Sequence, residues 1–253
     1  MFLIQACSGT KSLQLQNQSS PITVNGTLAD WQTSGAVVDE TEFANIYATR
    51  QGDNLYLYID AKSPRFEQSV RQSGLTIFLN HSKDNRKEIG IAFPAGTFNL
   101  LREHPAQYRS FINDPEWMQQ PGNQQLLQDL ESSLYDRVMI VDNAGTSAAN
   151  HGFVDFTQLG ADGIEIAINT ERRFFGLEVK VPLSGVSLFD LNSSQPIWFG
   201  MAVDPPTFRM QSQFDTTREA GMGRTDGRQA RQPTSNDIRQ MLGQLENWYR
   251  LDL

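Results

Sequence analysis

Residues 197–203 read Ile-Trp-Phe-Gly-Met-Ala-Val, and this stretch decides the fold class of the chain. Its large apolar side chains stand at every second position, which is the period of a β-strand with one buried face. The same alternation recurs in five other stretches, which are 55–59, 75–79, 89–93, 164–168 and 177–181.

Turn-forming residues separate these stretches, as at Asn25-Gly26, Gly52-Asp53-Asn54, 80–87 and Asp162-Gly163. Repeated short strands joined by turns are typical of antiparallel architectures. The sequence therefore predicts an all-β chain, an antiparallel β-sandwich of jelly-roll-like form.

A partly helical insertion is expected at 98–150, because Leu126, Leu127, Leu130 and Leu134 have helical spacing. Three prolines divide this region into short pieces, Asn123 is a candidate helix cap, and 138–141 is a candidate returning strand. We expect the leucine stripe of the insertion to pack on the strands.

A second break in the pattern is the Arg-rich loop 205–235, which carries five arginines and little apolar periodicity. The apolar residues of 238–245 predict a short C-terminal helix after it. The stretch 248–253 predicts a last strand, in which Trp248 and Tyr249 face opposite sides.

The composition of the 253 residues excludes several classes of protein. Charged residues make up 20% of the chain and hydrophobic residues 39%, which is typical of neither a disordered nor a membrane-spanning chain. The net charge of −8 argues against nucleic-acid binding. One cysteine and three scattered histidines predict no disulfide and no metal site.

The single cysteine, Cys7, lies in the string Leu-Ile-Gln-Ala-Cys-Ser-Gly at 3–9, which resembles a bacterial lipobox. The resemblance implies a lipoprotein with a signal peptide before Cys7 and a lipid on its thiol. We then expect a signal remnant and flexible tether at 1–20, one domain at 21–253, and a cell-envelope location in the outer membrane, its periplasmic or surface side left open. The alternative is an unmodified cysteine in a frayed terminus.

Four stretches together resemble the family-nine carbohydrate-binding modules and their DOMON-like relatives. They are Ile-Thr-Val-Asn-Gly-Thr-Leu-Ala-Asp-Trp at 22–31, the hairpin pattern of 47–57, Gly-Ile-Glu-Ile-Ala at 163–167 with Phe-Gly-Leu-Glu-Val-Lys-Val-Pro-Leu at 175–183, and Phe-Gly-Met-Ala-Val-Asp at 199–204. The resemblance implies a β-sandwich that binds carbohydrate. No cofactor is expected, with calcium as a structural ion at Asp53-Asn54 or Asp84-Asn85 as an open alternative.

Aromatic side chains are the candidate ligand-binding residues, because they stack on the apolar faces of sugars. Strand alternation turns Tyr56, Tyr58 and Trp198 away from the predicted core, and Tyr108 and Trp117 lie in the insertion. The alternative is that the insertion covers the outward aromatics. At the start of the chain, Trp31 is expected to pack in the core or as a lid.

Arg209 and its loop are candidates for an anionic ligand, although ion pairs with the nearby acids are the simpler interpretation.

The predicted function is non-catalytic binding of a carbohydrate or another cell-envelope ligand. No Gly-x-Ser-x-Gly motif supports an enzyme. A structural or assembly lipoprotein with a protein partner is one alternative. A haem-binding electron-transfer module using Met201 or His104 is another, although Met201 is expected in the core.

Overall fold

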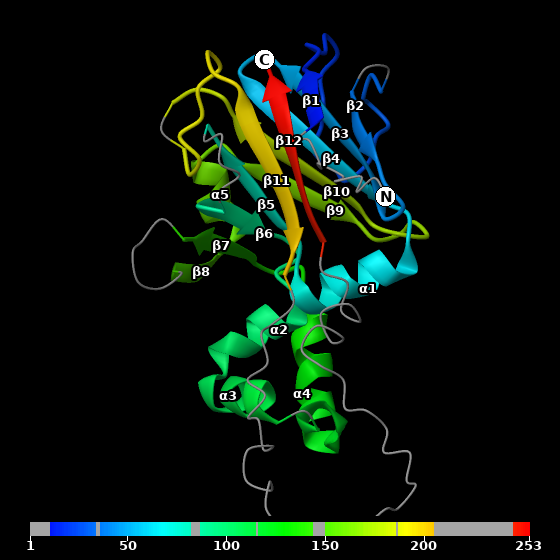
Figure 1. Cartoon of the computed structure of the whole chain (residues 1–253), viewed down its shortest axis with the longest axis vertical. Helices are drawn as coiled ribbons and strands as arrows, with labels where there is room; N and C mark the ends of the chain where they lie inside the picture. The colour runs from blue at the N-terminus through cyan, green and yellow to red at the C-terminus, as the bar shows by residue number, and fades with distance from the viewer. Residues whose placement is uncertain are drawn as a thin grey trace, which may run out of the picture.

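Two β-sheets form most of the structure, which is a computed structural model (Figure 1). It describes residues 11–33, 36–81, 87–114, 116–143, 150–185, 187–204 and 245–253. Within these ranges there are twelve strands and five short α-helices, so the expected β-rich class is confirmed.

The larger sheet has seven strands, and its neighbours are antiparallel except for the pair β1 and β12. In spatial order the strands are β1 (Lys11–Gln14), β12 (Leu245–Asp252), β11 (Ile197–Val203), β5 (Thr76–Asn80), β6 (Ile89–Ala92), β7 (Val138–Asp142) and β8 (Asn150–Val154).

The smaller sheet has five strands, all antiparallel to their neighbours. In spatial order they are β2 (Val37–Glu40), β3 (Ala44–Gln51), β4 (Asn54–Ala61), β10 (Gly176–Pro182) and β9 (Glu165–Asn169).

One apolar cluster joins the inner faces of the two sheets. It takes Leu57 and Val179 from the smaller sheet and Leu79, Phe199 and Met201 from the larger one, all nearly inaccessible to solvent. Each of the six alternating stretches forms a strand, and its aliphatic members point into this cluster as predicted. Met201 and Tyr249 are core residues, whereas Trp248 lies on the opposite face of its strand.

The helices are α1 (Pro64–Ser73), α2 (Thr97–Leu100), α3 (Pro105–Asn113), α4 (Pro121–Ser132) and α5 (Phe156–Ala161). Figure 1 shows α2, α3 and α4 gathered beyond one end of the sheets, and we call residues 97–132 the helical lobe.

The predicted insertion is correct in its helical part but ends too late. Residues 138–142 and 150–154 are β7 and β8, which extend the larger sheet. Pro105 and Pro121 occupy the first helical positions of α3 and α4, where a missing N–H costs nothing, so they begin helices rather than break them. The cap position of α4 is Gln120, and the prediction of Asn123 was wrong.

Residues 11–18 are part of the fold, which corrects the expectation of a flexible tether up to residue 20. Strand β1 pairs in parallel with β12, and Leu15 joins the core. The chain then crosses to the smaller sheet, where Gln16 and Gln18 exchange backbone hydrogen bonds with Arg50 of β3. The first described segment therefore joins one edge of each sheet.

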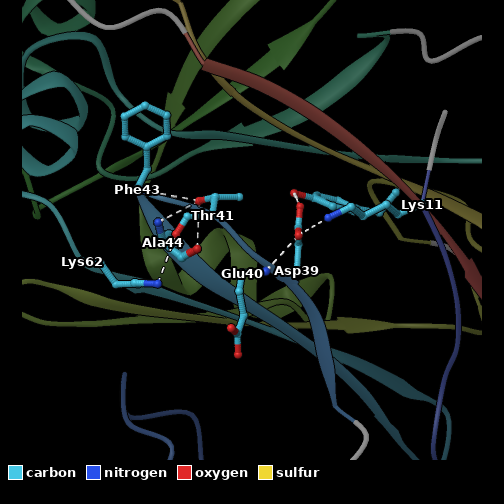
Figure 2. A network of polar contacts seen from close by, with 8 residues as sticks. Lys11, Asp39, Glu40, Thr41, Phe43, Ala44 and Lys62 are labelled. Atoms are coloured by element: carbon cyan, nitrogen blue, oxygen red, sulfur yellow. Dashed lines mark hydrogen bonds and ion pairs between the residues drawn. The ribbon is translucent and has the colours of Figure 1, made fainter. Parts of the chain in front are cut away.

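Polar contacts reinforce this junction (Figure 2). Asp39 of β2 pairs with Lys11 of β1 and accepts a hydrogen bond from the hydroxyl of Tyr249 at 3.1 Å. Close by, Lys62 donates to the carbonyl of Thr41 (Figure 2). Lys62 also donates to the side chain of Asn45, and the two bonds fix the turn from β2 to β3.

Residues 22–31, the first of the stretches that resemble the family-nine modules, contain no strand. They lie over the outer face of the smaller sheet and form hydrogen bonds with Glu178 of β10, a fully buried residue. Its carboxylate accepts hydrogen bonds from the backbone N–H groups of Asn25 and Gly26 and from the indole of Trp31, at 2.8, 3.0 and 2.8 Å. Burial raises the pKa of Glu178, although these three donors oppose the shift.

Replacing Glu178 by alanine should lower the free energy of unfolding by about 2–4 kcal/mol, because three buried donors lose their acceptor. Urea denaturation followed by tryptophan fluorescence measures this loss. Glu165→Ala, which removes an exposed partner of Lys180, is the matched control and should cost less than about 1 kcal/mol. Equal losses in the two variants would contradict the role assigned to Glu178.

Candidate functional site

A hollow of about 370 Å³ on the helical lobe is the candidate ligand site. It lies between α3 and α4, and its wall is mostly polar. The lining residues are Ala106, Gln107, Ser110, Asp114, Trp117, Gln120 and Asn123. Small-molecule pockets begin at roughly this size, about 300 Å³.

A small aromatic core inside the lobe holds the walls of the hollow. The ring of Phe111 stacks on Phe98 at 4.9 Å and meets Trp117 edge to face at 5.5 Å. Leucines of α4, among them Leu126 and Leu130, pack against the same cluster. Trp117 is only 4% exposed, so it supports the wall more than it offers a stacking platform.

Hydrogen bonds fix the polar groups of the rim. The Asp114 carboxylate accepts from the backbone N–H of Glu116 at 2.9 Å and from the Gln120 amide at 3.4 Å. The Asn123 amide donates to the carbonyl of Trp117 at 2.9 Å and to the side chain of Gln120. A carboxylate has about four lone-pair sites, so Asp114 retains capacity to accept from a ligand hydroxyl.

Of these residues the sequence reasoning identified only Trp117. Gln107, Ser110 and Asp114 follow one another at i, i+3 and i+7, which places Gln107 and Ser110 on one face of α3 and Asp114 at its C-terminal cap. This polar stripe was a detectable signal. The stripe contains no aromatic side chain, so it does not match the stacking pattern expected of a sugar site.

Tyr108, the other candidate of the lobe, has an occupied ring. The guanidinium of Arg102 lies over it, 5.6 Å from the ring centre, and the ring packs against the lobe core. The structure therefore brings Tyr108 and Trp117 into one cluster, with neither ring open as a flat surface.

Tyr56 and Tyr58 point away from the main core as expected, but residues 22–31 and Ala36 cover them rather than the insertion. The Trp31 ring contacts both, with centroids 6.4 and 6.0 Å away, in agreement with its expected role as core or lid. Burial raises the pKa of Tyr58 to about 12, and its hydroxyl donates to the carbonyl of Gly26. In this conformation neither tyrosine faces solvent.

Trp198 lies half-buried on the outer face of the larger sheet. On the same face, Trp248 and Phe78 stack at 6.1 Å. Each ring lies over a glycine of the neighbouring strand, where a Cβ atom would come within 2.4 Å of Trp248 at Gly200 or 2.7 Å of Phe78 at Gly90. The two glycines therefore let the aromatic rings lie close to the sheet.

The remaining candidates lie partly outside the described residues. Cys7, Arg209, the loop 205–235, the expected helix up to residue 244 and Asp84-Asn85 belong to that part of the chain. Asp53 is described, and it forms an ion pair with Arg50 at 3.6 Å. His104 lies at the start of α3, and Met201 lies in the core.

No group of three or more potential metal-ligating side chains occurs within the described ranges. In the same ranges, no helix has the length and apolar character needed to cross a membrane.

Comparison with known proteins gives the chain no relatives: no family model matches it, and no curated protein does either.

Replacing Gly200 by valine should displace the Trp248 ring and lower the free energy of unfolding by about 1–3 kcal/mol, because the added side chain occupies the space of the indole. Denaturant melts and tryptophan emission report both effects. Gly152→Val in the same sheet is the control, since nothing lies within 4 Å of its Cβ position. An unchanged emission spectrum in Gly200→Val would contradict the packing described.

Proposed function

We propose that the chain is a non-catalytic binding protein that holds a carbohydrate or a similar polyhydroxyl ligand in the hollow of the helical lobe. The observation that carries this proposal is the chemistry of the lining: amides, a hydroxyl and one carboxylate stand around an indole. These groups donate to and accept from hydroxyls, which is what a sugar requires.

The proposed mode of binding relies on hydrogen bonds more than on stacking. Trp117 offers little surface, whereas Gln107 and Ser110 are exposed at the rim. The contacts of Asp114 and Asn123 hold their side chains in place before a ligand arrives, which reduces the entropy lost on binding.

For the fold we propose a β-sandwich of jelly-roll-like form, similar to the family-nine modules. Two supports are the apolar cluster shared by both sheets and the hairpin of β3 and β4 at the expected place. Trp31 and Glu178 add a third, because both belong to the stretches that carry the resemblance.

Glycan binding should depend on the rim of the hollow. Gln107→Ala and Ser110→Ala should each weaken binding about 3- to 10-fold, the effect of one lost hydrogen bond between neutral groups. A glycan array selects the ligand, and calorimetry on each variant measures its affinity. Gln128→Ala, on an exposed face of α4, is the matched control. If the two rim variants bind glycan as tightly as the control does, the hollow is not the binding site. If the unmodified protein binds no glycan, the proposed function is wrong.

We also propose that the protein is a lipoprotein anchored through Cys7 in the cell envelope. Strand β1 includes Lys11, so at most residues 8–10 would separate a lipid on Cys7 from the sheet. Three residues span at most about 11 Å, so the β1 edge would stay close to the membrane.

Cys7→Ser should abolish lipid attachment and move the protein to the soluble fraction of cells that express it. Incorporation of labelled fatty acid, followed by membrane fractionation, checks this prediction. Ser8→Ala keeps the cysteine and serves as the control. Continued labelling of Cys7→Ser would contradict the proposed anchor.

A protein-interaction scaffold is a second candidate, and one feature of the lobe favours it. Helix α4 has no fully buried residue, and Met118 beside it is 36% exposed. Met118→Lys should then disrupt a complex isolated from the native cell envelope while leaving glycan binding unchanged.

A further inference from the structure

Arg102 and His151 form a hydrogen-bonded pair where the helical lobe meets the larger sheet. Arg102 lies in the short 3₁₀ turn after α2, and His151 lies on β8 at the edge of the sheet. Their nitrogens Nη1 and Nδ1 are 2.6 Å apart. The ring of Tyr108 lies on the other side of the guanidinium, and Arg102 itself is exposed.

This contact fixes the protonation of the histidine. A guanidinium can only donate, so Nδ1 must accept, and the imidazole is neutral with its proton on Nε2. Burial, and then the charge of Arg102, lower the pKa of His151. The Nε2 atom is itself buried and finds no partner among the described residues.

Other arginines nearby are neutralised by carboxylates. Arg137, which lies over the Phe153 ring of β8, pairs with Glu103, and Arg71 pairs with Glu131. Arg102 has no carboxylate within 4 Å in the described ranges, although Glu103 is the next residue. An exposed guanidinium that has no carboxylate partner in these ranges, beside a histidine that can take up a proton, is an arrangement that an anion would stabilise.

We propose that Arg102 and His151 together bind an oxyanion, either the carboxylate of an acidic sugar or a phosphate group. An anionic oxygen takes the place of the direct contact between Nη1 and Nδ1 and accepts from both nitrogens. His151 gains its second proton from solvent as the anion binds. This site uses no residue that lines the hollow, so it goes beyond the proposed function and does not depend on it.

The proposal fixes the direction of the pH dependence. A bound anion favours the imidazolium, so the pKa of His151 is higher in the complex than in the unliganded protein. Binding of a carboxylate, whose charge is constant in this range, is therefore strongest below the pKa of the unliganded state and weakens as pH rises through the pKa of the complex. Phosphate gains a second negative charge near the same pH, so the carboxylate probe is the one that tests this direction. The other charged groups beside the pair, Arg137 and Glu103, form an ion pair with each other.

The experiment is an NMR titration of the His151 imidazole in the full chain, with the resonance assigned by its loss in His151→Gln. Inorganic phosphate and glucuronate are the two probes, and glucose and chloride at matched ionic strength are the controls. An oxyanion should raise the pKa of His151 by about one unit, which corresponds to about tenfold tighter binding at low pH. A response to phosphate alone or to glucuronate alone identifies the source of the oxyanion.

Arg102→Gln should abolish the response to both probes and should raise the pKa of His151 even without ligand, because the neighbouring charge is gone. The pKa of His151 in the unliganded variant is a second measurement that needs no ligand. It tests the contact between Arg102 and His151 even if the substitution changes the conformation of the helical lobe. Arg109→Gln, an exposed arginine of α3, is the control and should bind as the unmodified protein does. A His151 pKa that neither probe moves, or that glucose and chloride move equally, would overturn the proposal. Binding that survives in Arg102→Gln would overturn it as well.

Discussion

The buried carboxylate of Glu178 determines which surfaces of this protein can meet a ligand. It accepts hydrogen bonds from three N–H groups of residues 25–31. These bonds hold residues 22–31, which we call the covering segment, on the smaller sheet. A charge can remain in such a place only when donors replace the water that it lost. The covering segment removes the outer face of the smaller sheet, with its two tyrosines, from solvent. Among the described residues, the outer surfaces that stay open to the proposed ligand are those of the helical lobe and the larger sheet.

The helical lobe has an apolar cluster of its own. Phe98, Phe111 and Trp117 form a cluster separate from the main core, and polar side chains of α3 and α4 surround the hollow beside it. The larger sheet offers a different surface, in which Trp248 and Phe78 lie on glycines. A hydrogen-bonding hollow and a flat aromatic face differ in chemistry, so they would select different parts of a ligand.

The alternation of apolar side chains along the sequence predicted the strands and their inward faces. This signal lies within each strand, and the inward side chains of the strands all pack into one core. It did not predict what lies on the outward faces, since alternation gives the side on which Tyr58 stands but not the segment that covers it. Strand β1 escaped prediction for a related reason: Lys-Ser-Leu-Gln has no period of its own, and its pairing with β12 joins opposite ends of the chain. In the lobe, the helical leucines were recognised, but the polar stripe of Gln107, Ser110 and Asp114 carries no apolar signal. The residues of α4 that face this stripe depend on how α3 and α4 pack against each other, and no local sequence pattern shows that packing.

The overall charge of the protein also constrains how an anion could bind. A net charge of −8 repels anions at long range, but salt screens that field over about 8 Å at physiological ionic strength. What remains is the local field, and beside His151 that field comes from a guanidinium in direct contact. An acidic protein can therefore bind an oxyanion at such a pair, provided that the contact is short and partly shielded from water. The half-buried position of His151 at the junction of lobe and sheet meets both conditions.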